Sequence, residues 1–172
     1  MAISNTNLFV AGRSLVKTNS TNLGITDSSD SIQITLHHET LELMTNEGGP
    51  RMPYKIINLG MTATITVPFA VYNVSQLDGL RKLPGSTSAD GNQLGTLGAD
   101  IQRFPITILP DLPNVQGYTF GNCYFEGDEN IGPWGYETLK RAVTFKAIFD
   151  PSILCDSTNS LFVYISNQLG CV

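Results

Sequence analysis

The stretch from Lys55 to Tyr72, KIINLGMTATITVPFAVY, alternates apolar and polar side chains along most of its length. Alternation with a period of two residues predicts a β-strand with one buried face and one solvated face. The apolar positions are Ile57, Leu59, Met61, Ala63, Ile65, Val67, Phe69 and Val71. Such a strand is longer than the usual length of roughly five or six residues, so it needs another long strand beside it.

The segment Ser31–Met44 is predicted to be that second long strand. Its apolar residues first follow one parity, at Ile32, Ile34 and Leu36, and then the other, at Leu41 and Leu43. One inserted residue reverses the face of a strand, so the change of parity predicts a β-bulge or bend near His37–Glu39. The segment between the two strands, Thr45–Pro53, contains two glycines and two prolines, which indicates a hairpin with a long tip. Long tips are uncommon without a role, and this one is long enough to reach a neighbouring subunit.

A short helix is predicted over Val74–Lys82, with Asn73 as its N-cap and Pro84-Gly85 as its stop signal. Residues 12–30 and 84–99 have the composition of loops. Pro105 places its strand at a sheet edge. Further strands are predicted at Leu8–Ala11, Arg103–Leu109, Tyr118–Glu126, Glu137–Phe149 and Leu161–Ser166. The sequence therefore predicts a mainly β fold, a β-sandwich or barrel of six to seven strands with one short flanking α-helix and a long hairpin tip.

Composition limits the class of protein. The chain has 172 residues, of which 41% are hydrophobic, enough for the core of one domain. Only 15% are charged, below the typical value of about 25%, and the net charge is −5. The sequence has no run of Lys or Arg, which argues against a tight nucleic-acid binder. Residues 1–20 lack the pattern of a secretory signal peptide, and no apolar run is long enough for a membrane helix.

Motifs for catalysis are weak, and the sequence predicts no enzyme, no cofactor and no metal site. His37, His38, Glu39 and Glu42 lie close together but provide too few ligands for a catalytic zinc, so surface histidines at a bend are favoured. Cys123, Cys155 and Cys171 match no zinc or redox spacing, which predicts reduced thiols.

The acidic cluster Glu126, Asp128 and Glu129 leaves three interpretations open. It is a solvated hairpin loop, a negatively charged lining or contact patch, or, least favoured, a pair of catalytic carboxylates. The nearby Trp134 lies between glycine-containing segments on a loop, where it either serves a contact or covers the end of the sheet.

The order of elements resembles that of the tail tube proteins of tailed bacteriophages and of related secretion tubes. The resemblance rests on SIQITLHHETLELM, YKIINLGMTATITVPFAVY, the helix NVSQLDGLRKL and the late pair YTFGNCYFEGDEN and LKRAVTFKAIFD. It implies one domain over residues 1–172, with an N-terminal arm and first strand at 1–30 and a C-terminal extension at 151–172.

The same resemblance implies a function. The protein would be a virion tail subunit, assembled in the host cytoplasm, that forms stacked hexameric rings around a conduit for DNA. Its partners would be copies of itself, other tail proteins and passing DNA, without a membrane. The candidates for contacts between rings are Glu47, Gly48, Gly49, Pro50 and Arg51. The candidates for a lumen or acidic patch are Glu126, Asp128 and Glu129.

Other functions remain open at this stage. A tail terminator, a head–tail connector or a capsid decoration protein would have a similar sequence pattern. A monomeric β-sandwich binding module would instead use Trp134, Tyr136 and Tyr124 as an aromatic platform. A hydrolase using the acidic cluster is the third class, and the absence of a spaced catalytic set argues against it.

Overall fold

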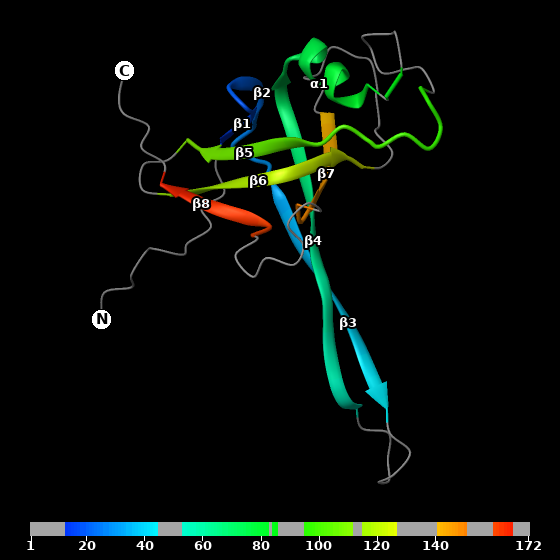
Figure 1. The fold of residues 1–172 in the computed structure, drawn as a ribbon. Coiled ribbons are helices and arrows are strands. Elements are labelled where there is room, and N and C mark those ends of the chain that lie inside the picture. The colour runs from blue at the N-terminus through cyan, green and yellow to red at the C-terminus, as the bar shows by residue number, and fades with distance from the viewer. Residues whose placement is uncertain are drawn as a thin grey trace, which may run out of the picture.

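The computed structural model describes residues 13–44, 53–82, 84–85, 95–111, 115–126, 141–150 and 160–166. Within these residues, eight strands form one antiparallel sheet accompanied by one helix (Figure 1). The mainly β prediction is confirmed, with more strands than the six to seven expected. The elements are β1 (Ser14–Thr18), β2 (Thr21–Thr26), β3 (Gln33–Met44), β4 (Pro53–Tyr72), α1 (Val74–Arg81), β5 (Phe104–Pro110), β6 (Gln116–Phe125), β7 (Arg141–Ile148) and β8 (Phe162–Ser166).

Six of the strands close on themselves into a small barrel. The hydrogen-bonded order is β2-β1-β5-β6-β7-β4, and β4 pairs again with β2 through Gly24↔Tyr72 and Ile25↔Val71. Because β2 and β4 pair at the seam, neither strand presents an unpaired edge there. β8 adds to β6, and β3 adds to β4 on the same edge as β2.

The barrel is filled by the inward side of each strand. Along β7 every second residue is buried, and the same alternation holds through residues 63–69 of β4. Three phenylalanines form the centre of this core, with no exposed surface: Phe69, Phe120 and Phe145. The alternation read from the sequence therefore predicts the core correctly in this half of β4.

The helix α1 covers the end of the barrel opposite the long β3–β4 extension (Figure 1). Asn73 caps it as predicted, since its Oδ1 accepts a hydrogen bond from the backbone N–H of Gln76 at 3.2 Å. Leu77 is its fully buried residue. Asp78 accepts a hydrogen bond from Arg81 at 3.0 Å and lies 3.9 Å from the buried Arg141 of β7, which ties the helix to the barrel.

Two sequence predictions about the barrel strands are wrong. Residues 12–30 were expected to be loop, but they contain β1 and β2, joined by a tight turn in which Asn19 adopts a φ of 51°. Pro105 was expected to place its strand at a sheet edge, but β5 lies between β1 and β6. The last pair between β1 and β5 is Lys17↔Thr107, so Pro105 itself lies where β5 has β6 as its one paired neighbour among the described strands, and a proline is tolerated there. The predicted strand at Leu8–Ala11 lies outside the described residues.

Candidate assembly surface on the β3–β4 arm

The strands β3 and β4 continue well beyond the barrel as a two-stranded ribbon (Figure 1). The last pair between β4 and β7 is Ala63↔Ala147, and residues 53–62 of β4 then pair only with β3 among the described residues. We call residues 37–44 and 53–62 the arm. At about 3.3 Å per residue the arm projects roughly 30 Å. A ribbon of two strands presents unpaired backbone groups along both edges, and by itself it is marginally stable in water.

One face of the arm carries a stripe of apolar side chains, Leu41, Leu43, Ile57 and Leu59, which we call the arm stripe. Leu41 lies directly opposite Ile57, and residues two apart on a strand share a face. Leu41 is 45% exposed and Leu59 is 59% exposed. Soluble monomers rarely leave contiguous apolar side chains in water in this way, and such patches mark interaction surfaces.

A bulge in β4 places the arm stripe on that face. Glu39 pairs with Gly60 and Thr40 pairs with Asn58, so Leu59 is the extra residue. Gly60 has a φ of 147°, and its N–H donates to the side chain of Asn58 at 3.1 Å. Because of the bulge, Ile57 and Leu59 lie on one face of β4 and Met61 lies on the other. The side chain of Met61 packs against the core.

The predicted bulge near His37–Glu39 is thus confirmed in its position along the ribbon, but the inserted residue belongs to β4 and not to β3. The register shift falls between Glu39 and Thr40, with the inserted residue in β4. The side chains of β3 alternate between its two faces without interruption. Leu41 and Leu43, at odd positions, therefore lie on the face opposite that of Ile34 and Leu36. The expectation that Ile57 and Leu59 belong to one buried face of β4 is therefore wrong.

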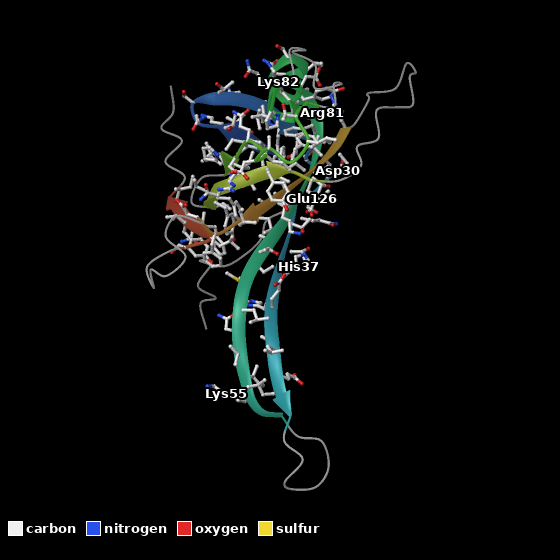
Figure 2. All side chains as sticks on the ribbon, turned by 45° about the vertical axis from the view of Figure 1, so that its right-hand side comes forward. Asp30, His37, Lys55, Arg81, Lys82 and Glu126 are labelled. Carbon is white, nitrogen blue, oxygen red and sulfur yellow. The ribbon has the colours of Figure 1, made fainter. Side chains whose placement is uncertain are left out.

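The charged residues of the described part of the arm are mainly acidic. Glu39 and Glu42 belong to β3, and Lys55 lies near the far end of the arm (Figure 2). His37 contacts the Thr64 hydroxyl through Nε2 at 3.2 Å, near the barrel and on the face of β3 that carries Leu41 and Leu43 farther along the arm. The described His, Cys, Asp and Glu residues form no group of three that could hold a metal ion.

The predicted ring-contact residues Glu47, Gly48, Gly49, Pro50 and Arg51 lie outside the described residues, between β3 and β4. Asp128, Glu129, Trp134 and Tyr136 also lie outside them, while Tyr124 is half-buried on β6. Of the described residues, the sequence analysis missed the exposed positions of the arm stripe. Its signal was the change of apolar parity in β3, which was interpreted as a local bend.

Glu126, at the end of β6, pairs with Lys146 of β7 rather than standing as a free carboxylate. The Lys146 Nζ donates a hydrogen bond to Glu126 Oε1 at 3.1 Å. This hydrogen bond is the main reason why the pKa of Lys146 is raised, with smaller contributions from Tyr124 and from the charges of Glu126 and Glu39. The charge of Lys146 thus interacts favourably with the carboxylates of Glu126 and Glu39 near the base of the arm.

Replacing Glu126 by glutamine is expected to lower the free energy of unfolding by about 0.5 kcal/mol at neutral pH, because the pair is partly exposed. A lysine whose pKa is raised on folding contributes stability below its unfolded pKa and loses it as the pH rises through the folded value. Urea denaturation curves of the two proteins should therefore converge above pH 10.5. The exposed control Asp100→Asn should have the same urea denaturation curve as the wild type at both pH values. A difference between the wild type and Glu126→Gln that persists at higher pH would contradict the assignment of the effect to the Lys146–Glu126 pair.

Cys123 is a free thiol buried in the barrel core, and burial raises its pKa to about 12. A thiol with such a pKa carries almost no thiolate at neutral pH, so it is unreactive. Cys155 and Cys171 lie outside the described residues. In the part of the chain that the structure describes, no helix has the length and apolar character needed to cross a membrane.

Comparison with known proteins finds similarity among solved structures. No protein-family model matches the chain, and no curated protein matches it. Among solved structures, the chain is similar to the tube terminating cap of the anti-feeding prophage, determined by cryo-EM. The two chains share 12% sequence identity and a TM-score of 0.48, and the match covers 96% of this chain and 95% of that chain. At this TM-score the likeness does not assign a role to the chain. The role has to be inferred from the chain's own residues.

Proposed function

We propose that this protein is a structural subunit of a phage-tail-like particle, and specifically a tail tube subunit that assembles with copies of itself through the arm. The arm carries the proposal, because it is a long ribbon with two free edges and an exposed apolar stripe. Neighbouring copies would pair with the edges and cover the stripe, and both effects stabilise an otherwise marginal ribbon. The proposed assembly is a stack of hexameric rings around a conduit for DNA.

The charge of the chain supports passage of DNA without binding. The net charge is −5, and the sequence contains no cluster of Lys or Arg. Tight binding to DNA depends on many cationic contacts to phosphates, so a lumen without them would let DNA slide. Function in this proposal requires no catalytic group, which agrees with the unreactive Cys123 and the paired Glu126.

The experiment removes the arm and keeps the barrel. Thr40 and Asn58 lie opposite each other, so residues 41–57 can be replaced by the two-residue turn Asn-Gly. The wild-type protein is expected to form rings or tubes in light scattering and negative-stain images. The shortened variant should keep the circular dichroism of the barrel and run as a single subunit.

The matched control is Ile56→Thr, which removes an exposed apolar side chain from the opposite face of the arm. Ile56 is 60% exposed and pairs with Glu42 rather than with the arm stripe. This control should assemble like the wild type. Assembly of the shortened variant to the same size as the wild type, or a wild-type protein that stays a single subunit at all concentrations, would contradict the proposed function.

A further inference from the structure

An apolar groove lies at the end of the barrel near α1, far from the arm. Its floor crosses three strands through Leu15, Ile25 and Val71, which are directly paired with one another and face outward. Val74, in the first turn of α1, forms part of its wall, and the volume is about 570 Å³. Val71 is 65% exposed and Val74 is 52% exposed. The hollow is open to solvent, and an exposed apolar surface of this kind marks a site of contact with other apolar side chains.

The lining of the groove contains no charged side chain, and one cation, Lys17, lies beside it, whereas the arm carries more acidic than basic residues. Lys17 faces outward two residues along β1 from Leu15, and it forms no ion pair with the charged side chains of the described residues. The N-terminal end of α1, at Val74 and Ser75, also borders the groove, and no acidic side chain lies in its first turn. The positive end of a helix dipole favours a nearby carboxylate. Glu39 of β3, two residues from Leu41 and therefore on the same face, supplies a carboxylate next to the arm stripe.

The groove of a subunit cannot receive the arm of the same subunit. Ile57 and Val71 belong to the same strand, β4, and lie about 45 Å apart at about 3.3 Å per residue. A straight strand cannot bring these two positions together. Contact between the arm stripe and the groove therefore needs two copies of the chain.

We propose that the groove formed by Leu15, Ile25, Val71 and Val74 is the docking site for the arm of a second copy. This inference rests on the proposed function and names the surface that the arm contacts. Apolar side chains of the arm stripe cover the groove floor, and Glu39, on the same face as the stripe, lies near Lys17 and the positive end of α1. The two surfaces are different, so the contact is heterologous and leaves a free arm and a free groove after each addition. Repetition of such a contact closes a ring or extends a stack.

The test uses two variants that each lose one surface. The arm variant is Leu41→Thr with Leu59→Thr, and the groove variant is Val71→Thr with Val74→Asp. Threonine keeps the β-propensity of the strands, and aspartate in the first turn favours the helix while repelling the acidic arm. Each variant alone should fail to extend and should remain at the mass of one building unit, either a subunit or a ring.

A mixture of the two variants should restore one contact and no more. The intact arm of the groove variant docks into the intact groove of the arm variant, so light scattering should show a species of twice the mass that contains both chains. A chain carrying all four substitutions should pair with neither variant. The control Val163→Thr changes an exposed residue outside the groove, and it should assemble like the wild type.

The outcomes separate this inference from the proposed function. A groove variant, or the single change Val74→Asp, that assembles as fully as the wild type would overturn the inference. So would a mixture that shows no doubling of mass. In both cases loss of assembly in the arm variant would still support the proposed function. A wild-type protein that does not assemble would overturn both.

Discussion

Replacing Phe145 by alanine is expected to lower the free energy of unfolding by about 3–5 kcal/mol, the range for a large aromatic removed from a packed core. Phe145 is fully buried at the centre of β7. Its ring meets Phe125 edge-on with centroids 5.4 Å apart, and meets Phe104 in the same way at 6.0 Å. Alanine would remove both aromatic contacts and leave a cavity between β5, β6 and β7. Since domains are stable by about 5–15 kcal/mol, a large part of the total would be lost.

This measurement needs a background that does not assemble, because self-association stabilises the folded state by mass action. The arm-shortened variant provides it, and chemical denaturation followed by fluorescence gives the free energy. Phe145→Leu is the matched control, with an expected loss of less than about 1.5 kcal/mol because most of the volume is kept. A loss below about 1 kcal/mol for alanine would show that the site is not the packed centre of the barrel.

Residues 63–69 show which part of the fold the sequence predicts well. Here one face of β4 meets the core and the other is partly exposed, so buried apolar residues alternate with Thr64, Thr66 and Pro68. The helix was equally predictable, because Asn73, Pro84 and Gly85 are local signals for its ends. These features depend on residues close together in the sequence.

The barrel closure and the candidate assembly surface depend on distant residues and were not predictable in the same way. β1 and β2 contain Ser, Thr, Asn and Gly, which individually favour turns, and they become strands because β5 and β4 supply hydrogen-bond partners. Likewise, Leu59 becomes exposed because the bulge at Gly60 lies opposite Glu39 on another strand. Ile57, Leu59 and Met61 continue the regular alternation in the sequence, so Gly60 is the one residue there that could have indicated the bulge.

Replacing Gly24 by alanine is expected to separate β2 from β4 and to lower the free energy of unfolding by about 1–3 kcal/mol, the usual range for overpacking. A Cβ at this position would overlap the carbonyl oxygen of Val71 and would lie 2.6 Å from Cδ1 of Phe69. Neither neighbour can easily move, because one is backbone and the other belongs to the buried core. Amide hydrogen exchange, measured in the arm-shortened background, should speed up in β2 and in residues 69–72 while β6 and β7 stay protected.

Gly121→Ala is the matched control, because a Cβ at Gly121 would meet nothing within 4 Å. It lies in β6, and alanine there should be neutral or slightly stabilising, since glycine weakens the interior of a strand. Equal exchange rates in the two variants would mean that the pairing of β2 with β4 does not close the barrel. Faster exchange confined to the Gly24 variant would instead show that the β2–β4 pair opens independently of β6 and β7 once its close packing is disturbed. Ile25 and Val71 of the groove floor belong to this strand pair.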